Sequence, residues 1–183
     1  MTRDLRSILS DLRSVIVAFS GGVDSAYLAW AATDVLGDRA LCVTADSPSY
    51  PAHHRELALS VAREFDLHHE IIFTGEIDRA EYRANPENRC YFCKNELYTQ
   101  LTQMARARGF AHVADGTNAD DRGDYRPGRQ AGREFGIRSP LDEVGLAKDE
   151  IRELSRLAGL PTWDEPASAC LSSRIPYLSL IHI

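Results

Sequence analysis

The amino-acid sequence predicts an α/β fold built on a doubly wound parallel sheet with helices on both faces. Short apolar runs rich in β-branched residues, such as Ser14–Phe19, alternate along the chain with longer helix-like segments. Continuous apolar runs of this kind are typical of strands buried on both faces. Repeated strand–helix units of this kind form parallel sheets through right-handed crossovers. The 183 residues are enough for one domain with one core.

The predicted elements follow one another in a regular order. Residues 3–12 place their leucines and isoleucine on one stripe and predict a first helix. Strands are predicted at 14–19, 40–45, 68–73 and 112–114. Further helices are predicted at 24–36, 52–65, 91–108 and 147–158, the last one stopped by Gly159 and Pro161. Residues 118–133 are polar and rich in Gly, Asp and Arg, which predicts a functional loop.

Composition and charge narrow the class of protein. The net charge is -6 and the pI is about 5.5, which disfavours a nucleic-acid partner because phosphate binding relies on basic surfaces. No apolar run approaches the roughly 20 residues that span a bilayer. The N-terminal residues contain acids and lack the apolar core of a signal peptide. We therefore expect a cytoplasmic protein with no membrane partner.

A phosphate-binding loop is predicted between the first strand and the helix that follows it. Its residues are Ser20, Gly21, Gly22, Val23, Asp24 and Ser25. This position lies at the carboxyl end of a strand and the amino end of a helix, where α/β folds bind phosphates. Glycine allows backbone N–H groups to approach an anion closely, and a carboxylate such as Asp24 suits a Mg²⁺ ion that bridges to phosphate. The loop is neither a Walker A motif nor a GxGxxG motif.

The SGGVDS loop resembles the SGGxDS loop of the PP-loop ATP pyrophosphatases. The resemblance implies an adenine nucleotide alpha hydrolase-like fold, with ATP and Mg²⁺ as ligands. It also implies that a substrate oxygen attacks the α-phosphorus of ATP, so that pyrophosphate leaves and an adenylate forms. By the same analogy Thr44, Ala45 and Asp46, at the end of the second strand, border the adenosine.

The cysteines indicate a second chemical centre. Cys90 and Cys93 form a CxxC pair, Cys170 lies far along the chain, and Cys42 is expected in the core because an apolar strand surrounds it. Three thiolates without a fourth ligand can hold a [4Fe–4S] cluster with one open iron, which can carry sulfide. Zinc is the alternative, with His68, His69 or His112 as the fourth ligand. Free thiols are a further alternative.

Four motifs together resemble the LarE family of ATP-dependent sulfur transferases. They are SGGVDS, RCYFCK, the pair Asp115-Gly116 followed after seven residues by DYRPG (124–128), and ASACLSSRIPY (167–177). The family prepares the nickel-pincer cofactor of lactate racemase. Its members adenylate the carboxylates of a pyridinium dicarboxylate mononucleotide and convert them to thiocarboxylates. Some members sacrifice a cysteine, and others hold a [4Fe–4S] cluster on three cysteines.

The resemblance assigns roles to particular residues. Cys170 stands one place after the position of the sacrificial cysteine, and Cys90 and Cys93 accompany it, so the chain resembles the cluster type with these three cysteines as ligands. Asp24, Cys170 and Lys94 are the expected catalytic residues, with Lys94 neutralising the leaving pyrophosphate.

Two arginines and a lysine complete these expectations. Arg126 and Arg174 are expected to bind phosphate, because a guanidinium group binds phosphate through two hydrogen bonds. Each has a surface arginine as its alternative reading, and a surface lysine is the alternative for Lys94. Lys148 is expected to start the last helix, in preference to the alternative of a catalytic lysine.

The resemblance ends at Tyr177. We therefore expect one PP-loop domain over residues 1–177 and a tail, 178–183, that does not match the family and indicates a truncated chain. The full-length protein is expected to form a homo-oligomer and to act on a small-molecule mononucleotide, and the motifs do not identify the source of sulfide. Three rival functions stay open: a tRNA-thiolating enzyme, an amide-forming synthetase and a nucleotide sensor.

Overall fold

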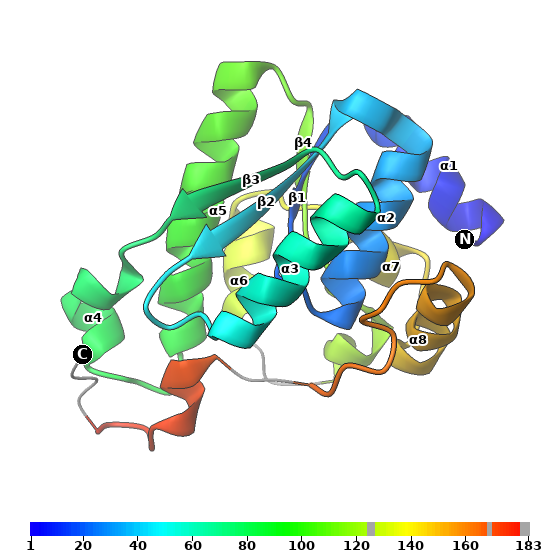
Figure 1. Cartoon of the computed structure of the whole chain (residues 1–183). Helices are drawn as coiled ribbons and strands as arrows, with labels where there is room; N and C mark the ends of the chain where they lie inside the picture. The colour runs from blue at the N-terminus through cyan, green and yellow to red at the C-terminus, as the bar shows by residue number, and fades with distance from the viewer. Residues whose placement is uncertain (124–126, 168–169, 180–183) are drawn as a thin grey trace.

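A four-stranded parallel sheet forms the centre of the molecule (Figure 1). The computed structural model describes residues 1–123, 127–167 and 170–179. The strands are β1 (Val15–Ala18), β2 (Ala40–Asp46), β3 (His69–Phe73) and β4 (His112–Ala114), in the spatial order β3-β2-β1-β4. Val15 of β1 pairs with Ala40 on one side and with His112 on the other. The predicted doubly wound parallel sheet is confirmed.

Helices connect the strands and cover the sheet. They are α1 (Arg3–Leu12), α2 (Val23–Leu36), α3 (Ala52–Glu64), α4 (Ala80–Arg83), α5 (Arg89–Arg108), α6 (Pro127–Glu134), α7 (Pro140–Glu143) and α8 (Lys148–Leu157). Single 3-10 turns lie at Gly37–Arg39, Glu76–Asp78, Ala119–Arg122 and Leu171–Arg174. The helices and strands predicted from the sequence agree with these bounds to within two residues.

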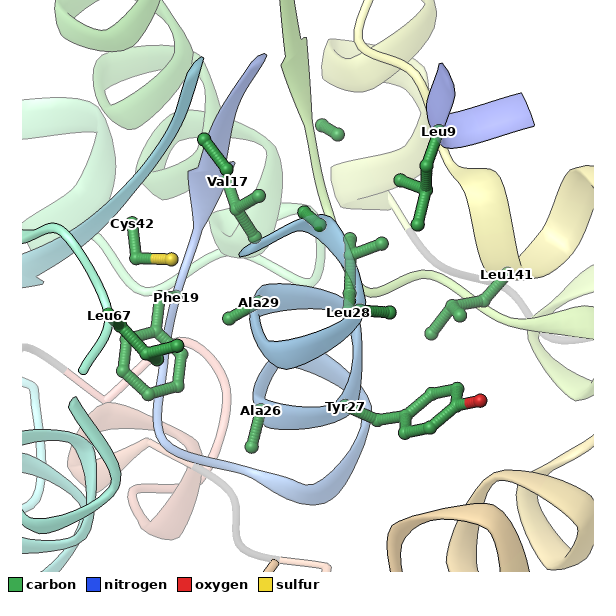
Figure 2. Packing of buried hydrophobic residues seen from close by; sticks show 14 of the residues in the cluster. Leu9, Val17, Phe19, Ala26, Tyr27, Leu28, Ala29, Cys42, Leu67 and Leu141 are labelled. Carbon is green, nitrogen blue, oxygen red and sulfur yellow. The ribbon is translucent and has the colours of Figure 1, made fainter. Parts of the chain in front are cut away.

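Alternation along β1 divides the core between the two faces of the sheet. Val15 and Val17 belong to the larger cluster, which also contains buried residues of α1, α2, α3 and α8. Figure 2 shows Val17 of this cluster together with residues of α1 and α2. Ile16 points to the opposite face, where Leu101 of α5 packs against β1, β2 and β4. Side chains of successive strand residues point to opposite faces, so a strand covered on both sides must be apolar throughout. Cys42 is fully buried in the larger cluster, as its apolar surroundings indicate.

The segment predicted as a loop at 118–133 contains a helix, and this prediction is corrected. The helix α6 lies against α5, and two of its glycines face that neighbour. A methyl group on Gly128 would stand 3.0 Å from Cγ of Lys94, and one on Gly132 would stand 3.9 Å from the ring of Tyr98. The glycines that indicated a loop therefore allow close packing of two helices.

The order of the strands creates a switch point beside β1. The chain leaves β1 towards β2 and β3 and later returns to the other side of β1 as β4. In open parallel sheets ligands bind in the crevice at the carboxyl ends of strands where this reversal occurs. Within residues 1–123, 127–167 and 170–179, no helix combines the length and the apolar character that crossing a membrane requires.

Candidate functional site

A cavity of about 890 Å³ opens at the carboxyl edge of the sheet. Its walls come from the ends of β1, β2 and β4, the first turns of α2, α5 and α8, and a C-terminal segment that includes Cys170. The phosphate loop and the three cysteines Cys90, Cys93 and Cys170 all line it, and we call the parts of the cavity around them the phosphate end and the cysteine end. The cavity therefore joins the two centres that the sequence predicts.

The phosphate loop is held in shape by hydrogen bonds centred on Ser25. Its hydroxyl accepts from the backbone N–H of Ser20 at 3.1 Å and donates to the carbonyl of Gly22 at 3.0 Å. Gly22 caps α2, whose first residues are Val23 and Asp24. The loop therefore presents the amino end of a 14-residue helix to the cavity, and such an end attracts anions.

Two glycines bring backbone segments into contact around this loop. Gly21 has φ +70, and a Cβ atom there would stand 2.6 Å from the carbonyl oxygen of His54 in α3. Gly116, after β4, would place a Cβ atom 2.9 Å from the backbone nitrogen of Ser25. Any larger residue would push the loop away from its neighbours. The position of the loop is thus fixed from two sides of the switch point.

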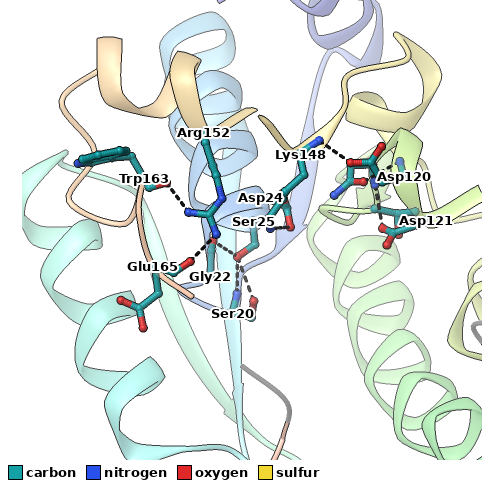
Figure 3. A network of polar contacts seen from close by, with 12 residues as sticks. Ser20, Gly22, Asp24, Ser25, Asp120, Asp121, Lys148, Arg152, Trp163 and Glu165 are labelled. Carbon is teal, nitrogen blue, oxygen red and sulfur yellow. Dashed lines mark hydrogen bonds and ion pairs between the residues drawn. The ribbon is translucent and has the colours of Figure 1, made fainter. Parts of the chain in front are cut away.

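Asp24 contributes one paired and one unpaired carboxylate oxygen (Figure 3). Its Oδ2 accepts from Nζ of Lys148 at 2.6 Å, and the backbone N–H of Lys148 donates to Asp120 at 2.8 Å. Oδ1 is buried and has no hydrogen-bond partner among the described residues. Mg²⁺ binds through one or two carboxylates together with substrate phosphates, so the unpaired Oδ1 fits a Mg²⁺ ion carried by a nucleotide.

Arg152 of α8 holds in place the chain segment that follows this helix (Figure 3). Its guanidinium group donates to the carbonyl oxygens of Trp163 and Glu165, both at 2.8 Å. The Glu165 carboxylate in turn pairs with Nε2 of His53 at 2.8 Å. These contacts bring the C-terminal segment back over α3.

A buried carboxylate joins the two ends of the cavity. Asp115, directly after β4, accepts from the hydroxyl of Tyr98 at 2.6 Å and from the hydroxyl of Ser139 at 2.8 Å. Nζ of Lys94 lies 3.9 Å from Asp115 and 5.1 Å from the centre of the Tyr98 ring. Burial by itself raises the pKa of Asp115, but Lys94 and the hydroxyl donors outweigh it, so the pKa lies below its ordinary value. Lys94 therefore has a structural partner as well as a place in the cavity wall.

The cysteine end of the cavity is partly buried. Burial, together with the nearby charge of Glu76, raises the pKa of Cys93 to about 12. Glu76 is 2% exposed and accepts from the hydroxyl of Ser49 at 2.5 Å. Cys90 is exposed, and Sγ of Cys170 lies 3.1 Å from Oγ of Ser173. The three thiols thus have different surroundings.

Arg89 fastens the segment that carries Cys170 to the start of α5. It is 2% exposed and donates to the carbonyl of Ser172 at 2.8 Å and to the hydroxyl of Ser173 at 3.1 Å. Its guanidinium group also contacts Asn85 and lies 5.2 Å from the centre of the Tyr177 ring. Among the described residues no carboxylate forms an ion pair with Arg89. Its hydrogen bonds therefore go to the backbone and to neutral side chains.

The arrangement of the cysteines does not support the predicted [4Fe–4S] cluster. In the part of the chain that the structure describes, no three Cys, His, Asp or Glu side chains are grouped as ligands of a metal ion. None of the histidines proposed for zinc (His68, His69 and His112) is among the described residues that line the cavity. Cluster ligation by Cys90, Cys93 and Cys170 stays a prediction.

The predicted binding residues lie in different places. Ser20, Gly22, Val23, Asp24, Ser25 and Ala45 line the cavity. Among the described lining residues neither Thr44 nor Asp46 appears, because the Thr44 hydroxyl donates to the carbonyl of Phe19 and Asp46 pairs with Arg55. Arg174 is exposed and is likewise not among them.

The two remaining predicted binding residues are Gly21 and Arg126. Gly21 packs behind the phosphate loop and is not among the described lining residues. Arg126 lies outside the described residues.

Sequence reasoning missed three buried polar residues at the site. His54, Glu76 and Arg89 are each less than a tenth exposed, and no motif distinguishes them from surface residues of a helix start or a turn. Lys148 was expected only to start a helix, which it does, and it also pairs with Asp24. Arg89 directly precedes the CxxC pair, but only its contacts with the C-terminal segment reveal its role.

The fold and the site together define a PP-loop ATP pyrophosphatase, with its phosphate loop at the switch point of a parallel sheet. The sequence model of the NAD synthase family matches residues 5–118, and the chain belongs to this family. The structure of NMN synthetase from Francisella tularensis shares the fold, with a TM-score of 0.72 at 20% sequence identity. That match covers 90% of this chain and 72% of the Francisella chain.

Two curated relatives match almost the whole chain. An uncharacterized protein of Synechocystis sp. is 49% identical over 174 residues, which is 95% of this chain and 65% of the relative. The pyridinium-3,5-bisthiocarboxylic acid mononucleotide synthase of Lactiplantibacillus plantarum is 36% identical over 174 residues, which is 94% of this chain and 63% of the relative. The chain thus spans slightly less than two thirds of the length of these proteins.

Proposed function

We propose that the chain is the ATP-binding part of a sulfur transferase that adenylates the carboxylates of a pyridinium dicarboxylate mononucleotide and converts them to thiocarboxylates. The observation that carries the proposal is that the phosphate loop and three cysteines line one and the same cavity. The similarity to the Lactiplantibacillus plantarum synthase supplies the substrate class. The net charge of -6 favours a small molecule over tRNA.

In the first step a carboxylate oxygen of the substrate bonds to the α-phosphorus of ATP. The bond from that phosphorus to the bridging oxygen breaks, and pyrophosphate leaves with the electron pair. The chain's contribution is to position and neutralise: α2 presents its amino end to the phosphates, and Lys148 balances Asp24. Mg²⁺, held by Oδ1 of Asp24, would supply positive charge to the phosphates.

In the second step a sulfur nucleophile attacks the activated carbonyl carbon, and AMP leaves together with the former carboxylate oxygen that bridged carbon and phosphorus. The cysteine end of the cavity is where such a nucleophile would be held. Cys90 is the exposed thiol there, and Cys93 and Cys170 are partly buried. Adenylation by this chain and assembly of the full-length protein into a homo-oligomer are parts of the same proposal.

An amide-forming synthetase is the second candidate, because the match over residues 5–118 is to the NAD synthase family. In that case ammonia would attack the adenylate, and the cysteines would have no part in the reaction. The two candidates therefore differ in what removal of the thiols does.

The test incubates purified protein anaerobically with ATP, Mg²⁺, the pyridinium dicarboxylate mononucleotide and a low concentration of sulfide. We expect pyrophosphate release that depends on the mononucleotide, and mass spectrometry should detect exchange of oxygen for sulfur in it. A variant with serine in place of Cys90, Cys93 and Cys170 should still release pyrophosphate but form much less thiocarboxylate. An amide product with ammonia, formed equally well by this variant, would favour the second candidate instead.

A further inference from the structure

A buried histidine borders the phosphate loop and has no role in the chemistry described so far. His54 lies in the first turn of α3, is 9% exposed and lines the cavity. Its Nε2 is buried and has no hydrogen-bond partner among the described residues. A buried polar atom without a partner destabilises the protein that contains it, so an orphaned ring nitrogen in a residue that lines a ligand cavity indicates a ligand.

The backbone around His54 is fixed to the phosphate loop. The carbonyl oxygen of His54 lies where a Cβ atom of Gly21 would approach to 2.6 Å, which only glycine avoids. The hydroxyl of Tyr50 donates to the carbonyl of Ser20 at 2.9 Å, so a second contact holds the same two segments together. The Tyr50 and His54 rings pack edge to face with their centres 6.5 Å apart. His54 is therefore held at a fixed place beside the loop.

Three described residues that line the cavity have an orphaned buried atom, the third being Nη1 of Arg129, and the atoms of Asp24 and His54 complement each other. Oδ1 of Asp24, on α2, is an acceptor suited to a cation, and Nε2 of His54, on α3, can be a donor suited to an anion. A magnesium-bound phosphate chain offers both. The neighbouring His53 differs in both burial and pairing: its side chain is 62% exposed and pairs with Glu165.

We propose that Nε2 of His54 donates a hydrogen bond to the pyrophosphate end of the bound nucleotide. The inference rests on the use of ATP by this site, and not on sulfur transfer. His54 is a binding residue of this chain in addition to the SGGVDS motif. It would increase the affinity for ATP and for the leaving pyrophosphate, but not for AMP.

The test compares matched substitutions at two histidines. His54→Leu removes the ring nitrogen, His54→Gln places an amide N–H near the position of Nε2, and His68→Leu, at an exposed histidine that is not among the described lining residues, is the control. Dissociation constants for ATP, pyrophosphate and AMP are measured by calorimetry in the presence of Mg²⁺. The unfolding temperature is measured with and without ATP.

We expect His54→Leu to weaken ATP and pyrophosphate binding roughly tenfold or more, as loss of a hydrogen bond to a charged group does. AMP binding should not change, and His54→Gln should restore most of the loss. Without nucleotide the unfolding temperature of His54→Leu should not fall, because the atom removed has no partner in the free protein. His68→Leu should bind ATP as the wild type does.

Two results would overturn the inference. One is wild-type affinity of His54→Leu for ATP and pyrophosphate. The other is an equal loss for AMP, or a fall in stability without nucleotide that glutamine does not repair, since packing alone would then explain His54. If His54 behaves as expected but no thiocarboxylate forms, the proposed function fails and this inference stands. If thiocarboxylate forms and His54→Leu is silent, only this inference fails.

Discussion

The two ends of the cavity are built in different ways. The phosphate end consists of one continuous hexapeptide between β1 and α2, fixed by close backbone approaches at Gly21 and Gly116. The cysteine end joins the start of α5 to a segment about 80 residues later, and the fastening is a buried arginine that donates to Ser172 and Ser173. One end is therefore a property of local sequence and strand order, whereas the other depends on long-range hydrogen bonds. We expect the two ends to respond separately to substitution.

The largest effect is expected at the phosphate end. Asp24→Ala removes the oxygen proposed to hold Mg²⁺ and should reduce pyrophosphate release about 100-fold or more. The fold should survive, because the lost contact is one partly exposed ion pair with Lys148. The assay is the initial rate of pyrophosphate release, with circular dichroism as the measure of folding.

A matched control lies on the same helix. Asp34 is exposed and pairs with Arg6 at 2.6 Å, far from the cavity, so Asp34→Ala should retain the wild-type rate. Release by Asp24→Ala at the wild-type rate would mean that the active site lies elsewhere.

The next effect separates the cysteine end from the phosphate end. Arg89→Met keeps the length of the side chain but leaves the carbonyl of Ser172 without its donor, which should lower the free energy of unfolding by about 1–3 kcal/mol. Cys170 should become more reactive towards iodoacetamide, since Ser173 next to it loses its fastening. ATP affinity should stay at the wild-type value. Urea unfolding, thiol mass spectrometry and calorimetry measure the three quantities.

The comparison variant is Arg83→Met, at an exposed arginine of α4. It should change neither stability nor thiol reactivity. If Arg89→Met instead weakened ATP binding as much as it exposed Cys170, the two ends would form one cooperative unit, and the contrast drawn here would be wrong.

The smallest expected effect is a change in how the stability of the protein depends on pH, and it concerns the buried carboxylate of Asp115. The pKa of Asp115 is lowered in the folded protein, so the unfolded chain binds this proton more readily. The carboxylate therefore contributes its full stabilisation above its ordinary pKa of about 3.9, and loses it as the pH falls through the lower, folded value. Asp115→Asn should be less stable at neutral pH but should lose stability less steeply below about pH 4.

Thermal unfolding between neutral and acidic pH measures this difference. Asp38→Asn, at an exposed aspartate, should give a curve parallel to that of the wild type. Parallel curves for Asp115→Asn as well would mean that the contacts with Tyr98, Ser139 and Lys94 do not shift the titration of this group.

Much of the phosphate end was predictable because its signals are local. Apolar runs gave the strands to within two residues, and the SGGVDS hexapeptide lies at the switch point where its sequence context predicted it. The helix α6 was not predictable from composition, because Gly128 and Gly132 indicate a loop unless a partner helix is known. The sequence likewise does not reveal that the Thr44 hydroxyl donates to the carbonyl of Phe19, or that Asp46 pairs with Arg55.

The sequence by itself determined the class of fold, the position of the phosphate loop and the presence of three cysteines that could act together. These follow from periodicity and from motifs a few residues long, where neighbours in the chain are neighbours in space. Only the tertiary structure decided that the cysteines share a cavity with the loop, and that His54 and Arg89 are enclosed. Burial and hydrogen-bond partners depend on segments that are distant in the chain, and no local pattern encodes those contacts.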